Sequence, residues 1–289
     1  MIFDGHLRQD NRPLLDCRQS RLQFFLEKSK IKIKSDLRQS NEKLKSKSTL
    51  FCAVFSKDPD RYELLRVHYE NVSRIRTSPV PLYIFEDNDK VPDYLVNYSV
   101  VLDRCVTIYE AWRVATGLCN TEFVGNLNLD DRFVVNGFEV LENALEKSGA
   151  DIIGGEWLIN IEGVGVTDPN VFQCTSKLGS FRRITTWPPE LIPNQILGSG
   201  VAQKGSLGPG TLWKTSIHNE IDYPTYFLNG QKIRSIGDSE FWKKIYKSER
   251  RIARLPAIIG VYNSCPSTQA EFRAHEDVKH LALSKGAVI

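Results

Sequence analysis

The chain has 289 residues, of which 41% are hydrophobic and 25% charged, and these fractions lie close to globular averages. It is therefore long and apolar enough to build a sizeable core. The 38 basic and 35 acidic side chains give a formal net charge of +3 at pH 7, which offers no argument for a nucleic-acid partner. No run of about 18 apolar residues occurs, so we expect no membrane-spanning helix.

The cysteine pattern argues against a zinc site. None of the six cysteines forms a Cys-x-x-Cys pair or has a histidine at zinc-ligand spacing. Cys52 and Cys119 lie among apolar residues, which predicts small buried side chains. The first residues also lack the charged-then-apolar pattern of a signal peptide. We therefore expect a cytoplasmic protein in a reducing compartment.

Residues 1–48 differ in composition from the rest of the chain. The stretch 16–47 is rich in Lys, Arg, Gln, Ser and Glu. Its apolar side chains form one small group, namely Leu22, Phe24, Phe25, Leu26, Ile31 and Ile33. This composition predicts a charged, exposed helical leader, followed by one domain over residues 49–289. A solvated leader without function and an arm that contacts a membrane surface or a protein partner both fit this pattern.

From residue 48 onward, strand and helix patterns alternate. Apolar runs predict strands over 49–55, 81–85, 96–102, 122–127, 151–155 and 157–161. Helical spacing predicts helices over 61–72, from a capping box at Thr107 and Glu110 onward, over 137–148 and over 238–246. Such alternation predicts an α/β fold with a mostly parallel sheet covered by helices on both faces. Ligands of these sheets bind at the carboxyl ends of the strands.

An acidic turn, Asn128-Leu129-Asp130-Asp131, follows the predicted strand 122–127. Carboxylates at a strand end can hold Mg²⁺ or Mn²⁺ while the phosphates of a substrate complete the coordination shell. Two aspartates before a helix also occur in plain turns and N-caps. The pair by itself therefore leaves both interpretations open.

Three ordered sequence blocks narrow the choice. The first block contains Tyr109-Glu-Ala-Trp112, Ala115 and residues 121–132. The second block contains residues 208–214, His218 and residues 237–242. The third block contains Val261-Tyr-Asn263, followed by Gln269 and Phe272-Arg273. In this order the blocks resemble the family 2 glycosyltransferases, and the resemblance covers residues 49–273. It implies a GT-A fold with a single Rossmann-like nucleotide-binding domain. It also implies inverting transfer of a sugar from a nucleotide-sugar donor to an acceptor hydroxyl.

The resemblance implies roles for individual residues. Asp130 is expected to bind the divalent metal, Mg²⁺ or Mn²⁺, and Asp131 to support it or to contact the donor sugar. Asp87, after the predicted strand 81–85, corresponds to the acid that contacts the nucleoside. Asp238 corresponds to the general base that takes the proton from the acceptor hydroxyl.

Two positions depart from the family pattern. Asn128 replaces the first aspartate of the common Asp-x-Asp-Asp element, and it offers an oxygen without a charge. The segment 55–59 lacks the usual Pro-x-Tyr-Asn sequence. Both departures bear on the choice of donor and on the need for a metal.

Three candidate residues carry two interpretations each. Asp238 precedes Phe241 and Trp242 at helical spacing, so it also fits a helix N-cap. Trp213 and Trp242 are candidates for stacking on the acceptor sugar, because an aromatic face suits the apolar face of a sugar. Both tryptophans equally fit the core or the wall of a groove.

Two other functions stay open. A nucleotidyltransferase uses a similar sheet and metal, but the loop 55–61 lacks the Gly-rich basic sequence that such enzymes need. A catalytically inactive, glycosyltransferase-like binding or scaffold protein would explain Asn128 and the charged leader. The retained Asp130, Asp131 and Asp238 favour an active enzyme. The acceptor is left open as a polysaccharide precursor, a lipid-linked glycan, a protein or a small molecule.

Overall fold

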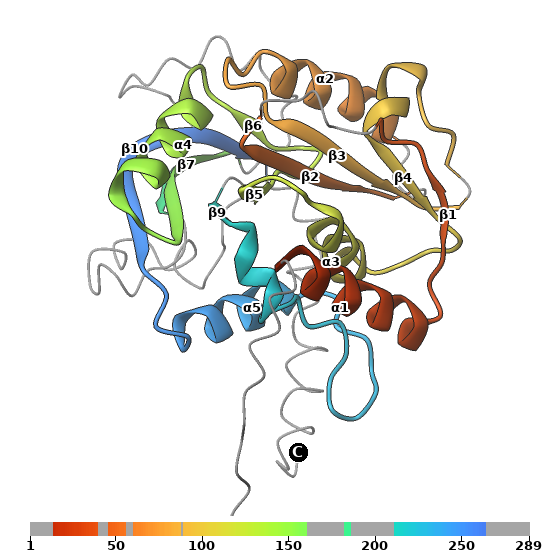
Figure 1. Ribbon diagram of the computed structural model, residues 1–289. Coiled ribbons are helices and arrows are strands. Elements are labelled where there is room, and N and C mark those ends of the chain that lie inside the picture. Colours follow the sequence, from red (N-terminus) through yellow and green to blue (C-terminus); the bar gives the residue numbers. More distant parts are fainter. Residues whose placement is uncertain are drawn as a thin grey trace, which may run out of the picture.

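The computed structural model describes residues 14–39, 46–55, 60–87, 89–160, 182–185 and 211–263. These residues form one ten-stranded sheet with helices on both faces (Figure 1). The strands are β1 (Ile33–Asp36), β2 (Ser48–Val54), β3 (Val80–Phe85), β4 (Ser99–Leu102), β5 (Phe123–Asn126), β6 (Arg132–Phe133), β7 (Ile152–Asn160), β8 (Arg182–Thr185), β9 (Leu212–Lys214) and β10 (Ile252–Asn263). Their order is β1-β4-β3-β2-β5-β9-β7-β10-β6, and β8 pairs with β7.

The sheet contains both parallel and antiparallel strands. β4, β3, β2 and β5 run parallel to one another, and β7 and β10 form a second parallel pair. Antiparallel strands complete the sheet, because β9 joins β5 to β7, β1 pairs with β4, and β6 pairs with β10. The predicted α/β class is confirmed.

Side chains of the central strand β2 alternate between the two faces of the sheet. Phe51 and Ala53 lie in one core cluster, whereas Cys52 and Val54 lie in another on the opposite face. Every residue of β2 is buried. A strand buried on both faces is a continuous apolar run, and this run is what predicted the strand over 49–55.

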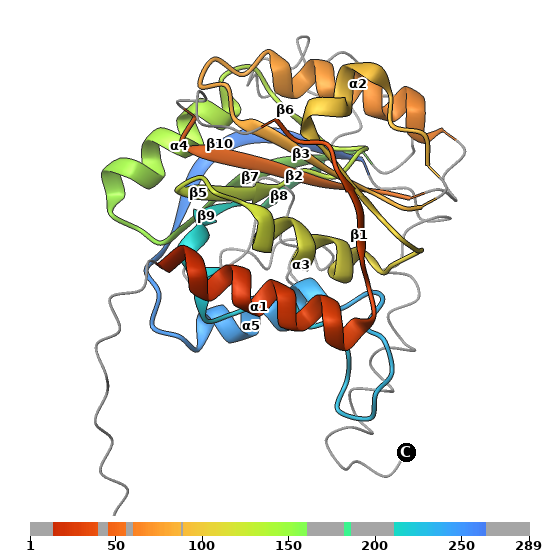
Figure 2. The ribbon, with the colours of Figure 1, turned by 45° about the vertical axis from the view of Figure 1, so that its right-hand side comes forward.

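Helices cover both faces of the sheet (Figure 2). α2 (Arg61–Ser73) and α4 (Gly137–Ser148) lie on one face, and α1 (Leu14–Ser29), α3 (Ile108–Leu118) and α5 (Gly237–Tyr246) on the other. The 3-10 helix η2 (Asp93–Tyr98) precedes β4, and the 3-10 helix η5 (Thr215–Asn219) follows β9. The predicted capping box at the start of α3 is present between Thr107 and Glu110. Within the described ranges, no helix combines the length and the apolar character needed to cross a membrane.

The prediction of a separate, exposed leader is wrong for one face of α1 and for β1, which pack with the rest of the chain. Leu22, Phe25 and Leu26 of α1 are buried in the cluster that also contains α3. A Cβ on Gly117 of α3 would lie 2.9 Å from the Cβ of Leu22, so the two helices pack closely. β1 extends the sheet beyond β4. The spacing i, i+3, i+4 gives α1 one apolar face, which the abundant charges on its other faces obscured.

Polar contacts also attach α1 to distant parts of the chain. Arg18 donates a hydrogen bond to the carbonyl oxygen of Cys119 at the end of α3. Asp222 pairs with Arg21 of α1 at 2.6 Å and with Arg113 of α3 at 3.1 Å. One carboxylate therefore joins both helices, and a boundary at residue 48 does not separate two units in the described part of the chain.

Five of the described strands, β1, β6, β8, β9 and β10, were absent from the sequence-based prediction, and two predicted strands form one. β7 is continuous where the sequence predicted strands over 151–155 and 157–161. β1 and β9 are short, with 4 and 3 residues. β10 contains Pro256, which lacks an amide donor, and its register with β7 shifts between Arg254 and Ile258. Short or interrupted strands give little periodicity to detect.

The packing of α1 can be tested with two neighbouring phenylalanines. Phe25 is 2% exposed, and the guanidinium of Arg113 lies 4.4 Å from its ring centroid. We expect Phe25→Ala to lower the free energy of unfolding by about 3–5 kcal/mol in urea denaturation. The control is Phe24→Ala, at a side chain that is 63% exposed, with a change within about 0.5 kcal/mol. Equal effects of the two substitutions would contradict a buried α1.

Candidate functional site

The carboxyl ends of β2, β3, β4 and β5 lie at one edge of the sheet, because these four strands are parallel. We call it the carboxyl edge. β5 is followed by the acidic turn 127–131, β3 by Glu86 and Asp87, and β4 by the segment 103–107 that leads into α3. Neighbouring strands are about 4.8 Å apart, so the ends of β5 and β3 are separated by about 10 Å.

The acidic turn presents one aspartate to solvent and buries the other. Asp130 is half-buried, whereas Asp131 is 0% exposed. The amide of Asp131 donates to the carbonyl oxygen of Asn128 at 3.1 Å, which closes the turn. The burial of Asp131 argues against its predicted contact with the donor sugar, and its alternative role as a support of Asp130 remains a prediction. Asp130 and Asn128 provide the accessible oxygens.

Arg132 lies on the buried side of the turn. Its guanidinium donates to the carbonyl oxygens of Leu129 at 2.5 Å and Asp131 at 2.6 Å, and to that of Leu64 in α2 at 3.3 Å. Burial lowers the pKa of Arg132, and the charges of Asp131 and Asp130 oppose this shift. One buried cation therefore balances the acidic turn and ties it to α2.

Two side chains of α2 hold the ends of the acidic turn. His68 bonds through Nε2 to the carbonyl oxygen of Leu127, at 3.1 Å. Asn71 donates to the carbonyl oxygen of Phe133 at 3.0 Å, and the amide of Phe133 donates back to Asn71 Oδ1 at 2.9 Å. The side-chain amide of Asn71 thus bonds to both backbone groups of Phe133, as a neighbouring strand would. The turn is thus fixed before and after its aspartates.

His68 is a buried, neutral side chain that hydrogen-bonds to the backbone. Its Nε2 faces a carbonyl oxygen, which only accepts, so this nitrogen carries the proton. Its Nδ1 then accepts from the hydroxyl of Tyr83 at 2.9 Å. Burial, together with the charge of Arg132, lowers the pKa of His68 to about 3, against a smaller opposing effect of the hydrogen bond to Leu127.

The acids after β3 are already engaged in contacts within the protein. Asp87, the predicted nucleoside contact, forms an ion pair with Lys34 of β1 and stays partly exposed. Glu86 is buried and accepts from the amide of Val106 at 3.1 Å. This bond links the end of β3 to the start of α3. The predicted role of Asp87 remains a prediction.

Asp238 is brought to the carboxyl edge from a different helix. It lies in the first turn of α5, and Ile236 occupies the N-cap position, so the N-cap interpretation of Asp238 is wrong. Its Oδ1 accepts from the amide of Ser239 at 2.7 Å and from the hydroxyl of Tyr109 at 3.3 Å. Tyr109 belongs to the first turn of α3, which follows the carboxyl end of β4.

Trp213 and Trp242 are core residues, and the prediction that they stack on an acceptor sugar is wrong. Their exposed fractions are 1% and 2%, and their ring centroids lie 5.5 Å apart. The indole of Trp213 also packs against Phe51 of β2 and donates to His218 Nε2 at 2.9 Å. Both rings fill the space between the sheet and α5, which leaves no face for a ligand.

The carboxyl edge offers few protein ligands to a divalent metal. Among the residues that the structure describes, no group of three or more His, Cys, Asp or Glu side chains is placed to hold a metal ion. Asp130 supplies one accessible carboxylate and Asn128 one amide oxygen. Mg²⁺ is often bound by one or two carboxylates together with substrate phosphates and waters. The donor set therefore fits a metal that binds together with a phosphate-bearing substrate.

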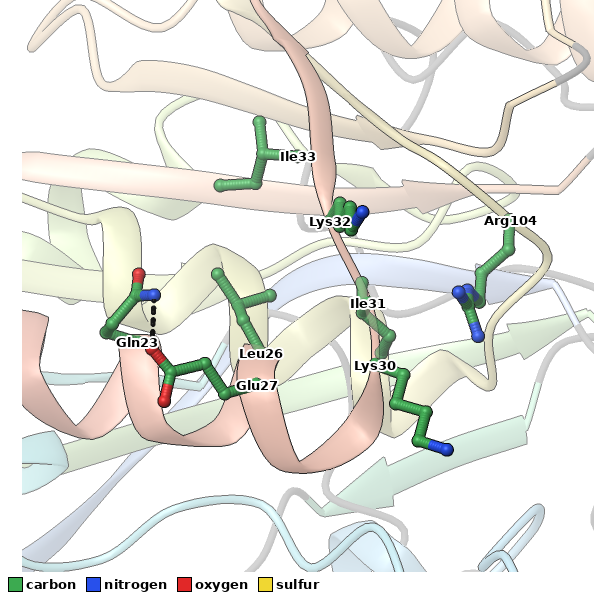
Figure 3. Close-up of a pocket in the computed structure, with 8 residues that line it drawn as sticks. All are labelled: Gln23, Leu26, Glu27, Lys30, Ile31, Lys32, Ile33 and Arg104. Atoms are coloured by element: carbon green, nitrogen blue, oxygen red, sulfur yellow. Dashed lines mark hydrogen bonds between the residues drawn. The ribbon is translucent and has the colours of Figure 1, made fainter.

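A separate depression of about 630 Å³ lies beside the C-terminal end of α1 (Figure 3). Its lining residues are Gln23, Leu26, Glu27, Lys30, Ile31, Lys32, Ile33 and Arg104. None of the predicted site residues is among them. Three of the lining side chains are basic, so the predicted contact of this basic segment with a membrane or a protein partner remains a prediction.

Comparison with solved structures identifies the fold. The chain is similar to residues 1–349 of S. aureus TarS, with a TM-score of 0.50 and 15% sequence identity over 82% of this chain. It spans 65% of the length of that TarS chain. At this identity the likeness shows the fold alone, and it confirms the predicted glycosyltransferase fold of the GT-A type.

Two further structures of the same TarS segment are described in complex with UDP and with UDP-GlcNAc. They give TM-scores of 0.48 and 0.46 at 14% and 16% identity, over 82% and 75% of this chain and 65% and 58% of those chains. No protein-family model matches the sequence, and no curated protein is similar to it.

Sequence reasoning missed the side chains that hold the acidic turn. His68 and Asn71 lie three positions apart on α2, on the side of that helix that faces the sheet. Two polar residues on the buried stripe of a helix are a signal that could have been used, because buried polar groups need partners. Arg132 was visible only as the residue after the aspartates. Its contacts with α2 depend on the tertiary fold.

The neutral state of His68 predicts a pH dependence of stability. The unfolded chain binds a proton at His68 near pH 6.5, whereas the folded chain binds it only near pH 3. The folded state therefore loses stability as the pH falls below about 6.5, by up to about 1.4 kcal/mol per pH unit. We expect His68→Gln to remove this contribution from the slope of unfolding free energy against pH, measured in urea. Identical slopes in both proteins below about pH 6 would contradict a buried neutral His68.

Proposed function

We propose that the protein is a nucleotide-sugar-dependent glycosyltransferase that binds its donor at the carboxyl edge. The observation that carries this proposal is that two carboxylates are attached to that edge of a GT-A fold, one in the turn after β5 and one through the first turn of α3, which follows β4. Asp130 is fixed by α2 from one face of the sheet, and Asp238 is held by α3 and α5 on the other. Nucleoside-diphosphate chemistry and proton transfer need separate carboxylates, and this arrangement supplies both.

Asp130 and Asn128 are the proposed ligands of a divalent metal. When bound together with the donor, such a metal offsets the charge that develops on the departing diphosphate. Arg132, His68 and Asn71 keep the turn in place while the metal and the donor bind. Asn128 lowers the negative charge of this ligand set by one unit relative to the family pattern, which would weaken the metal site in the absence of substrate.

The proposed donor is a nucleoside diphosphate sugar. UDP and UDP-GlcNAc, which are described bound to TarS, are the first probes to try. The end of β3 is about 10 Å from the end of β5, and this spacing supports a nucleoside on the side of Asp87 with the diphosphate on the side of Asp130. Because Asp87 pairs with Lys34, a nucleoside that contacts Asp87 would either bind beside this ion pair or replace Lys34 as the partner of Asp87.

Asp238 is the proposed general base. Its carboxylate would accept the proton of the acceptor hydroxyl while the oxygen bonds to the anomeric carbon and the diphosphate departs with the electrons of the broken bond. Attack from the side opposite the leaving group inverts the anomeric centre. A base within hydrogen-bond reach typically contributes about 10²–10⁴-fold to the rate.

The two aspartates are expected to fail in different ways. Asp130→Asn should weaken Mn²⁺-dependent donor binding by about 10–100-fold or more, because it removes the accessible carboxylate. Asp238→Asn should bind the donor normally and lose about 10²–10⁴-fold in turnover. Binding is measured by calorimetry, and turnover as nucleoside diphosphate released from UDP-GlcNAc, UDP-glucose and GDP-mannose with water as the acceptor.

Glu240→Gln is the matched control for Asp238→Asn. Glu240 lies on the same helix and pairs with Lys243 at 2.7 Å, so its replacement should leave both binding and turnover unchanged. A wild-type protein that binds nucleotide sugars and hydrolyses none of them would contradict the transferase. It would support the alternative of an inactive binding or scaffold protein, which Asn128 favours.

A further inference from the structure

The N-cap position of α5 carries no capping side chain. Ile236 occupies this position and makes no side-chain cap. The first amides of a helix have no partner within the helix, and a Ser, Thr, Asp or Asn side chain usually accepts from them. In α5 the carboxylate of Asp238 accepts from one of these amides, that of Ser239, at 2.7 Å.

Tyr109 of α3 reaches the start of α5. Its ring lies on Gly237, where a Cβ would be 2.5 Å from the Cγ of Tyr109, so only glycine permits this approach. The hydroxyl of Tyr109 donates to Asp238 Oδ1 at 3.3 Å. The Asp238 carboxylate is therefore held by the amide of Ser239 in its own turn and by the hydroxyl of Tyr109 from α3.

The hydroxyl of Tyr109 keeps its proton and can therefore donate a hydrogen bond at physiological pH. Burial raises the pKa of Tyr109 well above its usual value, and the charge of Asp238 raises it further. The phenol therefore stays protonated across the physiological range. A carboxylate that accepts from such a donor is stabilised in its charged form.

The surroundings keep Tyr109 in place. The next residue, Glu110, is buried and completes the capping box of α3. Its carboxylate also accepts from the hydroxyl of Tyr226 and from Nζ of Lys232, each at 3.0 Å. The preceding turn is tied to the end of β3 through Val106. The first turn of α3 is therefore held from three sides.

We propose that Tyr109 is the positioning residue of the general base: its ring packs on the start of α5, and its hydroxyl fixes the Asp238 carboxylate for proton transfer. This inference rests on the proposed function of Asp238. Tyr109 itself touches neither donor nor acceptor in this account, and it acts only through Asp238.

Tyr109→Phe tests the role, because it keeps the ring on Gly237 and removes only the hydroxyl. Turnover of whichever sugar nucleotide the wild type hydrolyses is measured between about pH 5 and 8. We expect kcat to fall about tenfold with the donor KM unchanged, and the acid limb of the kcat profile to move up by about one pH unit. A hydrogen bond to a charged group accounts for a change of this size.

Two further variants separate positioning from packing. Tyr223 is buried and the charge of Asp238 contributes to its raised pKa, but its ring stacks on Phe241 of α5, at a centroid distance of 4.2 Å. Tyr223→Phe should therefore keep the wild-type pH profile. Gly237→Ala displaces the Tyr109 ring while keeping its hydroxyl, and it should shift the acid limb in the same direction as Tyr109→Phe.

The outcomes distinguish this proposal from the proposed function. An active wild type whose acid limb is unmoved by Tyr109→Phe overturns the positioning role and leaves the transferase standing. The titration of the Asp238 carboxyl, followed by ¹³C NMR and assigned with Asp238→Asn, needs no turnover. If Tyr109→Phe leaves the titration midpoint of Asp238 unchanged, the positioning role is overturned, whether or not any donor is hydrolysed. A wild type that hydrolyses no donor would overturn the transferase separately.

Discussion

The buried guanidinium of Arg132 is the contact on which the candidate site depends. It lies beneath the acidic turn, donates to two of the turn's carbonyl oxygens, and reaches α2 through Leu64. A buried carboxylate such as that of Asp131 would be costly without a nearby cation. Because Arg132 balances this charge inside the protein, Asp130 is left at the surface of the turn. His68 and Asn71 then fix the strand ends on either side, so α2 determines where the accessible carboxylate lies.

The second half of the site is organised from the opposite face of the sheet. The first turn of α3 bonds to the end of β3 through Val106, to α5 through Tyr109, and to the segment 225–232 through Glu110. Asp238 is thereby attached to the same edge as Asp130, although the two belong to elements far apart in the chain. The helix α2 fixes the turn that carries Asp130, whereas the helix α5 carries Asp238 on the other face of the sheet, and the parallel strands between them end at one edge. This division explains how a metal-linked acid and a base can be held independently.

Features encoded by neighbouring residues could be predicted from the sequence, and features made by distant packing could not. The apolar run of β2, the capping box at Thr107 and the acidic turn each depend on a few adjacent residues. The burial of Trp213 and Trp242 depends on the meeting of β9 with α5, and the burial of α1 on its contact with Gly117 in α3. Sequence reasoning gave Asp130 and Asp238 through a family resemblance. It gave no information on Tyr109, Arg132 or His68 as their supports, because each acts across the fold.

The central claim is that the carboxyl edge binds a nucleoside diphosphate through Asp130 and a divalent metal. The most direct test is the thermal stability of the wild type and of Asp130→Ala with UDP, GDP or ADP, each with and without Mn²⁺. A ligand that binds only the folded state raises the melting temperature by mass action. We predict a rise for one nucleoside diphosphate that requires Mn²⁺ and disappears in Asp130→Ala. No rise with any nucleotide, or an equal rise in the variant, would contradict the claim.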